Sequence, residues 1–363
     1  MTLVERKVEN SIAKEMANNQ DTIDSCVERV GSVVKPITGA VLARILSVRL
    51  FRTYVGRPLL RANEWGWNHL PSSFRDTRPV RHYGMFLHRL VKQRSARRQY
   101  HGTFFLRNRP ELELLRAIAG KRERGATLRI GVVACSNGAE VYSIVWAIRS
   151  ARPDLKLVVH AVDISREVVA IAKQGFYPLE MQQLIGSNIF ERLTGEEIGQ
   201  IFDREEGWLK IQPWLKDNIE WHVGDAGDRE LALRLGALDI VVANKFLCHM
   251  NPPEAEQCLH GVAQLVRPGG YLFVSGVDLD LRTRVALQLG WVPVKELIEE
   301  IHDGDPSVRR DWPWRYWGLE PFDRTKPHWD IRYASVYQLG RPEASVHGWS
   351  TNSPGRESAI LST

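Results

Sequence analysis

Acidic residues that follow short apolar runs are the first chemistry the sequence offers. Asp163 directly follows the apolar run 157–162, and Glu140 is the first residue of a segment whose apolar residues have helical spacing. A small-residue turn at 135–139 precedes that helix and follows another apolar run at 128–134. In open α/β sheets, ligands bind at the carboxyl ends of the strands, and an acid after the second strand can bind ribose hydroxyls. The order of these segments predicts a site for a nucleoside-bearing cofactor.

The turn at 135–139 argues against a dinucleotide. A dinucleotide site needs G-x-G-x-x-G, because the backbone must approach a pyrophosphate at the start of a helix. Only Gly138 lies in this turn, and Glu140 would repel a pyrophosphate but attract an ammonium group. S-adenosylmethionine (SAM) has a ribose and an amino-acid tail and no phosphate, so Glu140 and Asp163 suit it. Both acids also have a purely structural interpretation, since an acid in a helix's first turn is favourable by roughly 0.3–1 kcal/mol.

Later segments extend the same pattern and predict the sheet. We expect strands at 219–224, 237–244 and 271–275, a helix at 252–266 and a turn at 267–270. The segments 291–297 and 331–338 are expected to close the sheet as an antiparallel pair. The sequence therefore predicts an α/β fold with a doubly wound, Rossmann-like, seven-stranded sheet of the class I SAM-methyltransferase type and an N-terminal helical region.

Several motifs between residues 100 and 340 carry a family resemblance. The segment 103–107 is similar to T-x-F-F-R, with Leu106 in place of the second Phe, and 134–144 is similar to A-x-S-x-G-x-E-x-Y-S-I. Asp163-Ile164 matches a D-I pair, and Asn244 matches the Asn of an R-N pair. With these motifs the chain resembles the chemotaxis-receptor glutamate methyltransferases of the CheR type.

The resemblance implies SAM as the cofactor and assigns residues to it. In that family the Arg of the entry motif reaches the cofactor's carboxylate and borders the substrate, so Arg107 is expected to act in catalysis as well. Asp225 falls where the family usually has an Asn that contacts adenine. The expected cofactor-binding residues are Thr103, Arg107, Ala134, Ser136, Gly138, Glu140, Asp163, Ile164, Asp225, Ala226 and Asn244.

Departures from the family concern the substrate. Ala243 stands where the R-N pair has Arg, Cys248 stands where R-N-x-x-x-Y-F has Tyr, and His249 follows. Replacing Arg by Ala removes a planar fork that would bind a carboxylate. Neither the family's N-terminal helical domain nor its receptor-tethering insertion is recognisable in the sequence. The cofactor chemistry therefore carries over to this chain, and the chemoreceptor substrate does not.

Methyl transfer itself needs little acid–base help. It is an in-line displacement in which the protein aligns the nucleophile and excludes water. A hydroxyl nucleophile benefits from a base with a pKa near neutrality, and His249 is the best-placed imidazole; its alternative interpretation is a helix-entry residue bonded to backbone. A carboxylate needs no base. The segment 251–254, Asn-Pro-Pro-Glu, comes too late after the fourth strand for an amine methylase and predicts a helix start.

These observations predict a SAM-dependent methyltransferase that moves a methyl group to an acceptor oxygen, a hydroxyl or a carboxylate, with a small metabolite as the expected acceptor. Protein glutamate O-methylation is the alternative enzyme hypothesis. A non-catalytic SAM-sensing or RNA-associated binding module is the alternative from another class. The absence of an amine-methylase motif argues against nucleic acid as the acceptor.

Composition divides the 363 residues into three parts. We predict a helical, arginine-rich region at 1–98, a methyltransferase domain at 99–341 and a disordered tail at 342–363, which is rich in Ser, Gly and Pro. The four cysteines, Cys26, Cys135, Cys248 and Cys258, have neither paired nor metal-ligand spacing, so we expect a reducing cytoplasm and no metal site. No signal peptide is recognised, and no apolar run reaches the ~18 residues of a membrane span.

Two features have more than one interpretation. The arginines before residue 99, with a net charge of +6, are expected on the solvated faces of packing helices, and an acidic partner is the alternative. The aromatic segment 311–318 contains Trp312, Trp314, Tyr316 and Trp317. It can roof the substrate pocket, or it can pack a loop onto the sheet.

Overall fold

The computed structural model describes residues 64–75, 77–94, 101–181, 187–305, 312–314 and 318–340. The part of the predicted helical region before residue 64, the arginines in it, Cys26, Tyr316, Trp317 and the tail at 342–363 lie outside these residues. The predicted domain boundary at 98/99 also lies outside them, so it stays a prediction.

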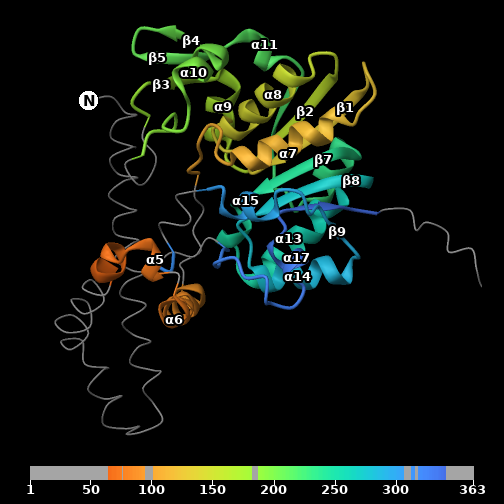
Figure 1. The fold of residues 1–363 in the computed structure, drawn as a ribbon. Helices are drawn as coiled ribbons and strands as arrows, with labels where there is room; N and C mark the ends of the chain where they lie inside the picture. Colours follow the sequence, from red (N-terminus) through yellow and green to blue (C-terminus); the bar gives the residue numbers. More distant parts are fainter. Residues whose placement is uncertain are drawn as a thin grey trace, which may run out of the picture.

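A seven-stranded sheet forms the centre of the molecule, in the order β6-β2-β1-β7-β8-β10-β9 (Figure 1). Its strands are β1 (Thr127–Val133), β2 (Lys156–Asp163), β6 (Ile219–Val223), β7 (Leu238–Asn244), β8 (Val266–Ser275), β9 (Val292–Pro293) and β10 (Val336–Gln338). The first five strands in the sheet order run parallel, and β10 is antiparallel to both of its neighbours. The predicted doubly wound sheet and its closing antiparallel pair are confirmed.

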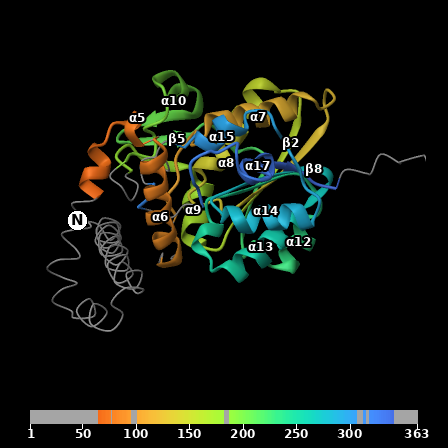
Figure 2. The same ribbon diagram turned by 60° about the horizontal axis from the view of Figure 1, so that its bottom comes forward.

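Helices cover both faces of the sheet (Figures 1 and 2). Two of them, α7 (Arg109–Gly120) and α8 (Ala139–Ala151), contribute to one apolar core, and α12 (Arg229–Leu235), α13 (Pro252–Gln264) and α14 (Leu279–Gln288) contribute to the other. Every residue of β7 is buried, because a parallel strand between two helix layers has no solvated face. This is why the strands appear in the sequence as continuous apolar runs.

Two predicted boundaries are wrong. The turn expected at 267–270 lies within β8, where Gly269 has φ +77° and a register shift separates Leu238 and Ile240 on the neighbouring strand. A side chain at Gly270 would lie 2.8 Å from the Asp239 carbonyl, so the two strands approach too closely for any other residue. In the last predicted strand, residues 331–333 belong instead to helix α17 (Trp329–Tyr333).

An inserted antiparallel sheet was not recognised in the sequence. Strands β3 (Phe176–Pro178), β4 (Phe202–Glu205) and β5 (Trp208–Ile211) form it in the order β3-β5-β4, between α9 (Arg166–Gln174) and β6. The helices α10 (Gly195–Ile201) and α11 (Pro213–Lys216) adjoin it. Strands of three or four residues are too short to show a period of two in the sequence. The chain therefore contains an insertion that its sequence did not reveal.

Aromatic rings attach this small sheet to the main domain. Phe105 lies 4.9 Å from Phe202 and 5.5 Å from Tyr177, measured between ring centroids, and it also stacks on Phe190. All four rings are buried. Because Phe105 belongs to the segment 103–107, the inserted sheet packs directly behind the predicted entry motif.

The described N-terminal part is helical and packs on the aromatic segment. It contains a helix at 64–69, α5 (Ser72–Arg75) and α6 (Arg78–Arg94). The Trp312 ring lies 5.6 Å from that of Trp67, edge to face, and 6.2 Å from that of His88. Gly84 on α6 leaves room for the Trp312 ring, which would collide with any side chain there. Within the described ranges, no helix is both long enough and apolar enough to cross a membrane.

Candidate functional site

A cavity of about 230 Å³ opens where the parallel strands end. Its walls come from the turns after β1, β2, β6 and β7, and from the segment that precedes α7. The lining residues are His101, Gly102, Thr103, Arg107, Ala134, Ser136, Glu140, Asp163, Ile164, Gly224, Asp225, Ala226, Asn244, Lys245, Phe246, His249 and Met250. Parallel strands bring their carboxyl ends to one edge, so residues far apart in the chain meet here.

Most of the residues that the sequence singled out line this cavity. All the expected cofactor residues except Gly138 are among them, and so is His249. Gly138 serves the turn instead, because it has φ +88° and a side chain there would lie 2.9 Å from Cβ of Ala172. It is the N-cap residue of α8, which begins at Ala139.

Six lining residues were not predicted. They are His101, Gly102, Gly224, Lys245, Phe246 and Met250. Each adjoins a predicted residue in the chain or lies within a few positions of one. Their position beside the motifs could therefore have indicated that they line the cavity. The side chains alone gave no reason to choose them.

The turn after β1 has an unusual backbone. Ala134 and Ser136 have φ of +55° and +50°, a region that non-glycine residues enter at a cost of order 1–3 kcal/mol each. Asp163 stabilises the turn, because its Oδ2 accepts a hydrogen bond of 2.8 Å from the Ser136 N–H. A second bond of 2.9 Å joins the Cys135 N–H to the Val162 carbonyl. The turn is therefore attached to the end of β2.

Asp163 has a structural role as well as a place in the cavity. Its Oδ1 accepts a further hydrogen bond of 3.0 Å from the Ser165 N–H, and the residue is 4 % exposed. The carboxylate is thereby fixed in orientation. The next residue, Ile164, is 58 % exposed and presents an apolar surface at the cavity wall.

Two glutamates, the buried Glu111 and the half-buried Glu140, share one amide. Asn244 Nδ2 donates to Glu111 Oε1 at 2.7 Å and to Glu140 Oε1 at 2.9 Å, and the Ser275 hydroxyl donates to Asn244 Oδ1 at 2.7 Å. Burial, with Glu140 adding to it, raises the pKa of Glu111 to about 8. Burial also raises the pKa of Glu140. Glu111 was missed in the sequence because it lies on α7, far from the strand ends in the chain.

Two cationic side chains, Arg107 and Lys245, line the same cavity. Arg107 Nε donates to Asp305 Oδ2 at 2.8 Å, and Arg192 Nη2 donates to Asp305 Oδ1 at 3.0 Å. Asp305 is 2 % exposed, so this network fixes Arg107 from behind. Burial lowers the pKa of the Lys245 ammonium, and no ion pair joins Lys245 to any carboxylate of the residues that the structure describes.

His249 lies in the short 3-10 helix η2 (Leu247–His249), half-buried at the cavity wall. Its backbone N–H donates to the Phe246 carbonyl at 3.0 Å. Ala243 and Cys248, the two departures from the resembled family, are both buried and do not line the cavity. The side chains around His249 that do line it are Lys245, Phe246 and Met250.

The donor set of the cavity fits SAM. Carboxylates suit an ammonium group and ribose hydroxyls, an exposed apolar side chain suits a planar base, and a guanidinium suits a carboxylate. The cavity contains all of these groups within one continuous wall.

Comparison with known proteins agrees with this chemistry. The family model for the SAM-binding domain of CheR methyltransferases matches residues 101–280. A probable biofilm formation methyltransferase, WspC, of Pseudomonas putida is 28% identical over 195 residues, which are 51% of this chain and 43% of that protein. Chemotaxis protein methyltransferase 2 of Pseudomonas aeruginosa is 31% identical over 182 residues, 48% of this chain and 61% of that protein. The chain thus spans about half the length of these relatives.

Among solved structures, magnesium protoporphyrin IX methyltransferase from Synechocystis with bound SAM is similar at 14% identity and a TM-score of 0.31. The match covers 68% of this chain and 86% of that one. A score this low carries no argument, and the fold assignment follows from the sheet order described above. Residues 101–280 of this chain are similar to the SAM-binding domain of CheR methyltransferases, and SAM is the cofactor.

Proposed function

We propose that this chain is a methyltransferase that moves a methyl group from SAM to an acceptor oxygen. The observation that carries the proposal is the cavity at the strand ends, which gathers the motif residues of the CheR family together with Arg107, Lys245 and His249. SAM supplies an electrophilic methyl group when bound. The protein's part is to bind, orient and exclude water.

In this proposal the cofactor's parts have separate partners. Glu140, supported by Asn244 and Glu111, holds the ammonium group, and Asp163 accepts hydrogen bonds from the ribose hydroxyls. Ile164, Asp225 and Ala226 surround the adenine, and Thr103, Ala134 and Ser136 complete the wall beneath. Their positions in the cavity and their match to the family motifs support these assignments.

Arg107 holds the cofactor's carboxylate and borders the acceptor. Its connection to the buried Asp305 supports this role, because a guanidinium held by a second carboxylate keeps its fork in one orientation. The same connection keeps part of the guanidinium's charge compensated before any ligand binds.

The acceptor end favours an anion. Lys245 adds a second cation beside Arg107, and together they attract a carboxylate and repel a protonated amine. Burial lowers the pKa of Lys245, and a carboxylate bound beside it would favour the charged ammonium form. His249 lies on the same wall and is the proposed base where the acceptor is a hydroxyl. We infer a small carboxylic acid or hydroxy acid as the acceptor.

A carboxylate on a protein is the second candidate acceptor. The inserted three-stranded sheet favours it, because the resembled family carries a receptor-tethering insertion and this chain has an insertion that the sequence did not reveal. The names of the relatives point to proteins of chemotaxis and biofilm formation. For this chain we therefore propose a protein carboxylate as the second candidate, separate from the small-molecule acceptor.

A labelling experiment tests the function. Purified protein is incubated with cell extract and SAM labelled in its methyl group, and the products are separated by size and then treated with alkali. We expect label in the small-molecule fraction, released as methanol if the acceptor is a carboxylate and retained if it is a hydroxyl. Label in the large fraction supports the protein acceptor instead.

Two further results would count against the proposal. If the protein binds SAM but forms no S-adenosylhomocysteine, the hypothesis of a non-catalytic binding module would hold instead. Label in nucleic acid would contradict an acceptor oxygen of the proposed kind. Lys245→Met separates acceptor binding from cofactor binding, because we expect less labelled product and a nearly unchanged affinity for SAM.

A further inference from the structure

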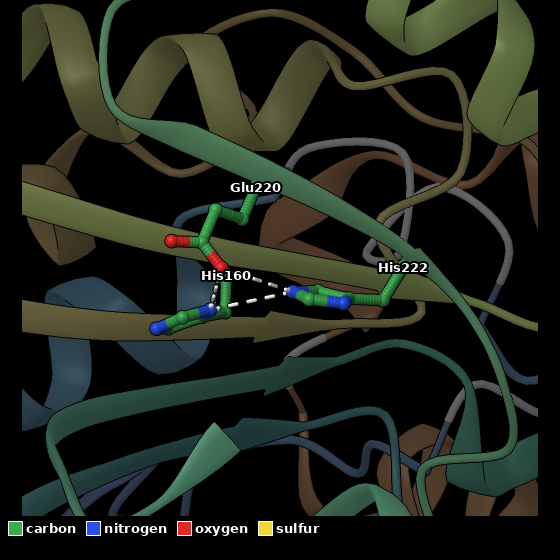
Figure 3. A group of neighbouring side chains, drawn as sticks. All are labelled: His160, Glu220 and His222. Carbon is green, nitrogen blue, oxygen red and sulfur yellow. Dashed lines mark hydrogen bonds and ion pairs between the residues drawn. The ribbon is translucent and has the colours of Figure 1, made fainter. Parts of the chain in front are cut away.

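Three possible metal ligands lie together at the edge of the central sheet. His160 is on β2, and Glu220 and His222 are on the neighbouring edge strand β6. His160 is in register with Glu220, and Val162 with His222. Because side chains alternate along a strand, this register puts all three on one face of the sheet. Figure 3 shows the three side chains pointing toward one another.

The distances between their polar atoms suit a metal ion. His160 Nδ1 lies 3.3 Å from His222 Nε2 and 3.3 Å from Glu220 Oε2, and His222 Nε2 lies 3.9 Å from Glu220 Oε2. A tetrahedral zinc ion with bonds of about 2.0–2.1 Å holds its ligand atoms about 3.3–3.4 Å apart. Two of the three separations already have this length. The third needs only a small movement of Glu220, whose side chain is 59% exposed.

The chemistry of the set agrees with its geometry. Two imidazole nitrogens and a carboxylate oxygen are a common zinc ligand set, and they leave a fourth position for water. The site is reached from solvent, because Glu220 is exposed and His222 is half-buried, while His160 is buried. None of the three residues lines the cofactor cavity, so the site is separate from it.

Neighbouring charges set a limit on affinity. Arg129 Nη2 lies 3.4 Å from His160 Nε2, and Arg234 also acts on His222. Both are cations, so they weaken the binding of a cation. When His160 binds metal through Nδ1, its Nε2 carries the proton and the contact with Arg129 must be given up. We expect a site of moderate affinity rather than a tightly closed structural one.

We propose that His160 Nδ1, His222 Nε2 and Glu220 Oε2 bind one divalent transition-metal ion, of which Zn²⁺ is the best match. The ion links the edge strand β6 to β2. These two strands end at Asp163 and lead to Asp225, both of which line the cofactor cavity. Metal binding therefore stabilises the adenosine side of the cavity and takes no part in methyl transfer.

Cobalt and zinc titrations test the site on the full chain without a polyhistidine tag, after removal of metal by a chelator. We expect one Co²⁺ per chain, with visible absorption bands and no thiolate charge-transfer band. The second criterion excludes the buried thiols Cys135, Cys248 and Cys258 as the ligands. Zn²⁺ displaces the Co²⁺ and raises the melting temperature, because it binds the folded state.

Matched variants decide the outcome. His222→Ala and Glu220→Gln should each weaken Co²⁺ binding by roughly tenfold or more, and His82→Ala, an exposed histidine on α6, should leave it unchanged. Glu220→Gln carries the test if the histidine variant does not fold, since Glu220 is exposed. Less than one ion per chain, a thiolate band, or equal binding by the wild type and Glu220→Gln would overturn the proposal.

Discussion

Asp163 combines two tasks in one carboxylate. Its two oxygens accept the Ser136 and Ser165 N–H groups, and the same carboxylate faces the cofactor cavity. A change of this residue is therefore expected to affect both cofactor affinity and the turn after β1. Separating the two effects requires one variant that keeps the shape of the side chain and one that removes it.

We predict that Asp163→Ala weakens SAM binding by roughly 2 kcal/mol or more, because a buried hydroxyl would lose a charged acceptor. Calorimetry with SAM or S-adenosylhomocysteine measures this. Asp163→Asn should lose much of the affinity but less of the melting temperature, since its amide oxygen can still accept one N–H. Asp228→Ala is the control, an exposed acid in the loop after β6 that does not line the cavity. Full affinity in folded Asp163→Ala would reject the ribose assignment.

Arg107 is predicted to need its guanidinium and not only its charge. Arg107→Lys keeps the cation but loses the planar fork and the Nε bond to Asp305, so we expect weaker SAM binding or slower turnover by roughly tenfold. Binding and single-turnover assays on the same preparation measure it. Arg109→Lys is the matched control, because Arg109 also pairs with a carboxylate, that of Glu197, but on the surface. Equal losses in both variants would point to a general effect on stability.

Glu111 gives stability a dependence on pH. Its pKa is about 8 in the folded state, above the ordinary value of 4.5. Between these values the folded chain retains a proton that the unfolded chain has released. The free energy of unfolding therefore falls as pH rises through this window, and the contribution of Glu111 is flat below and above it.

We predict that Glu111→Gln removes this fall and is more stable than the wild type at about pH 8, by on the order of a few kcal/mol, but not at about pH 4. The glutamine oxygen can still accept the Asn244 Nδ2 hydrogen bond. Urea unfolding of both proteins at several pH values gives the difference. A difference that does not change with pH would show that Glu111 is ionised throughout.

At the scale of elements, the aromatic segment joins the N-terminal helices to the sheet domain. Trp312 packs on Trp67 and His88, and neither Trp312 nor Trp314 lines the cofactor cavity. The packing interpretation of this segment is therefore the one that the described residues support. Tyr316 and Trp317 lie outside them.

We predict that Trp312→Ala lowers the melting temperature by several degrees, because truncating a packed Trp costs about 3 kcal/mol. Trp314→Ala should also act on stability. In both variants the KM of the acceptor should stay near the wild-type value. A raised KM with an unchanged melting temperature would instead support the interpretation that this segment covers the acceptor pocket. Thermal unfolding and acceptor kinetics on each variant separate the two.

At the scale of the whole molecule, the inserted sheet and the main domain meet at one segment. Phe105 packs against the insertion, and Arg107, two residues later, lines the cofactor cavity. A partner bound to the inserted sheet would thus lie close in the chain to a residue of the site. This arrangement is the physical basis of the protein-acceptor alternative.

The sequence by itself determined the parallel sheet and most of the cofactor cavity. Strands between two helix layers must be apolar throughout, and each has its functional residue at its carboxyl end or within a few positions after it, as β2 ends at Asp163. Such signals are local, so they survive without knowledge of the fold. The exception is Gly138, which matches a motif but serves backbone geometry and packing.

Only the tertiary structure decided which distant residues meet. Glu111 joins Asn244 across 133 positions, and Arg107 joins Asp305 across 198. His160 and His222 are 62 positions apart, so their pairing depended on the register of β2 with β6. Neither composition nor periodicity contains this information, because contacts across a sheet are fixed by how strands pair and not by spacing along the chain.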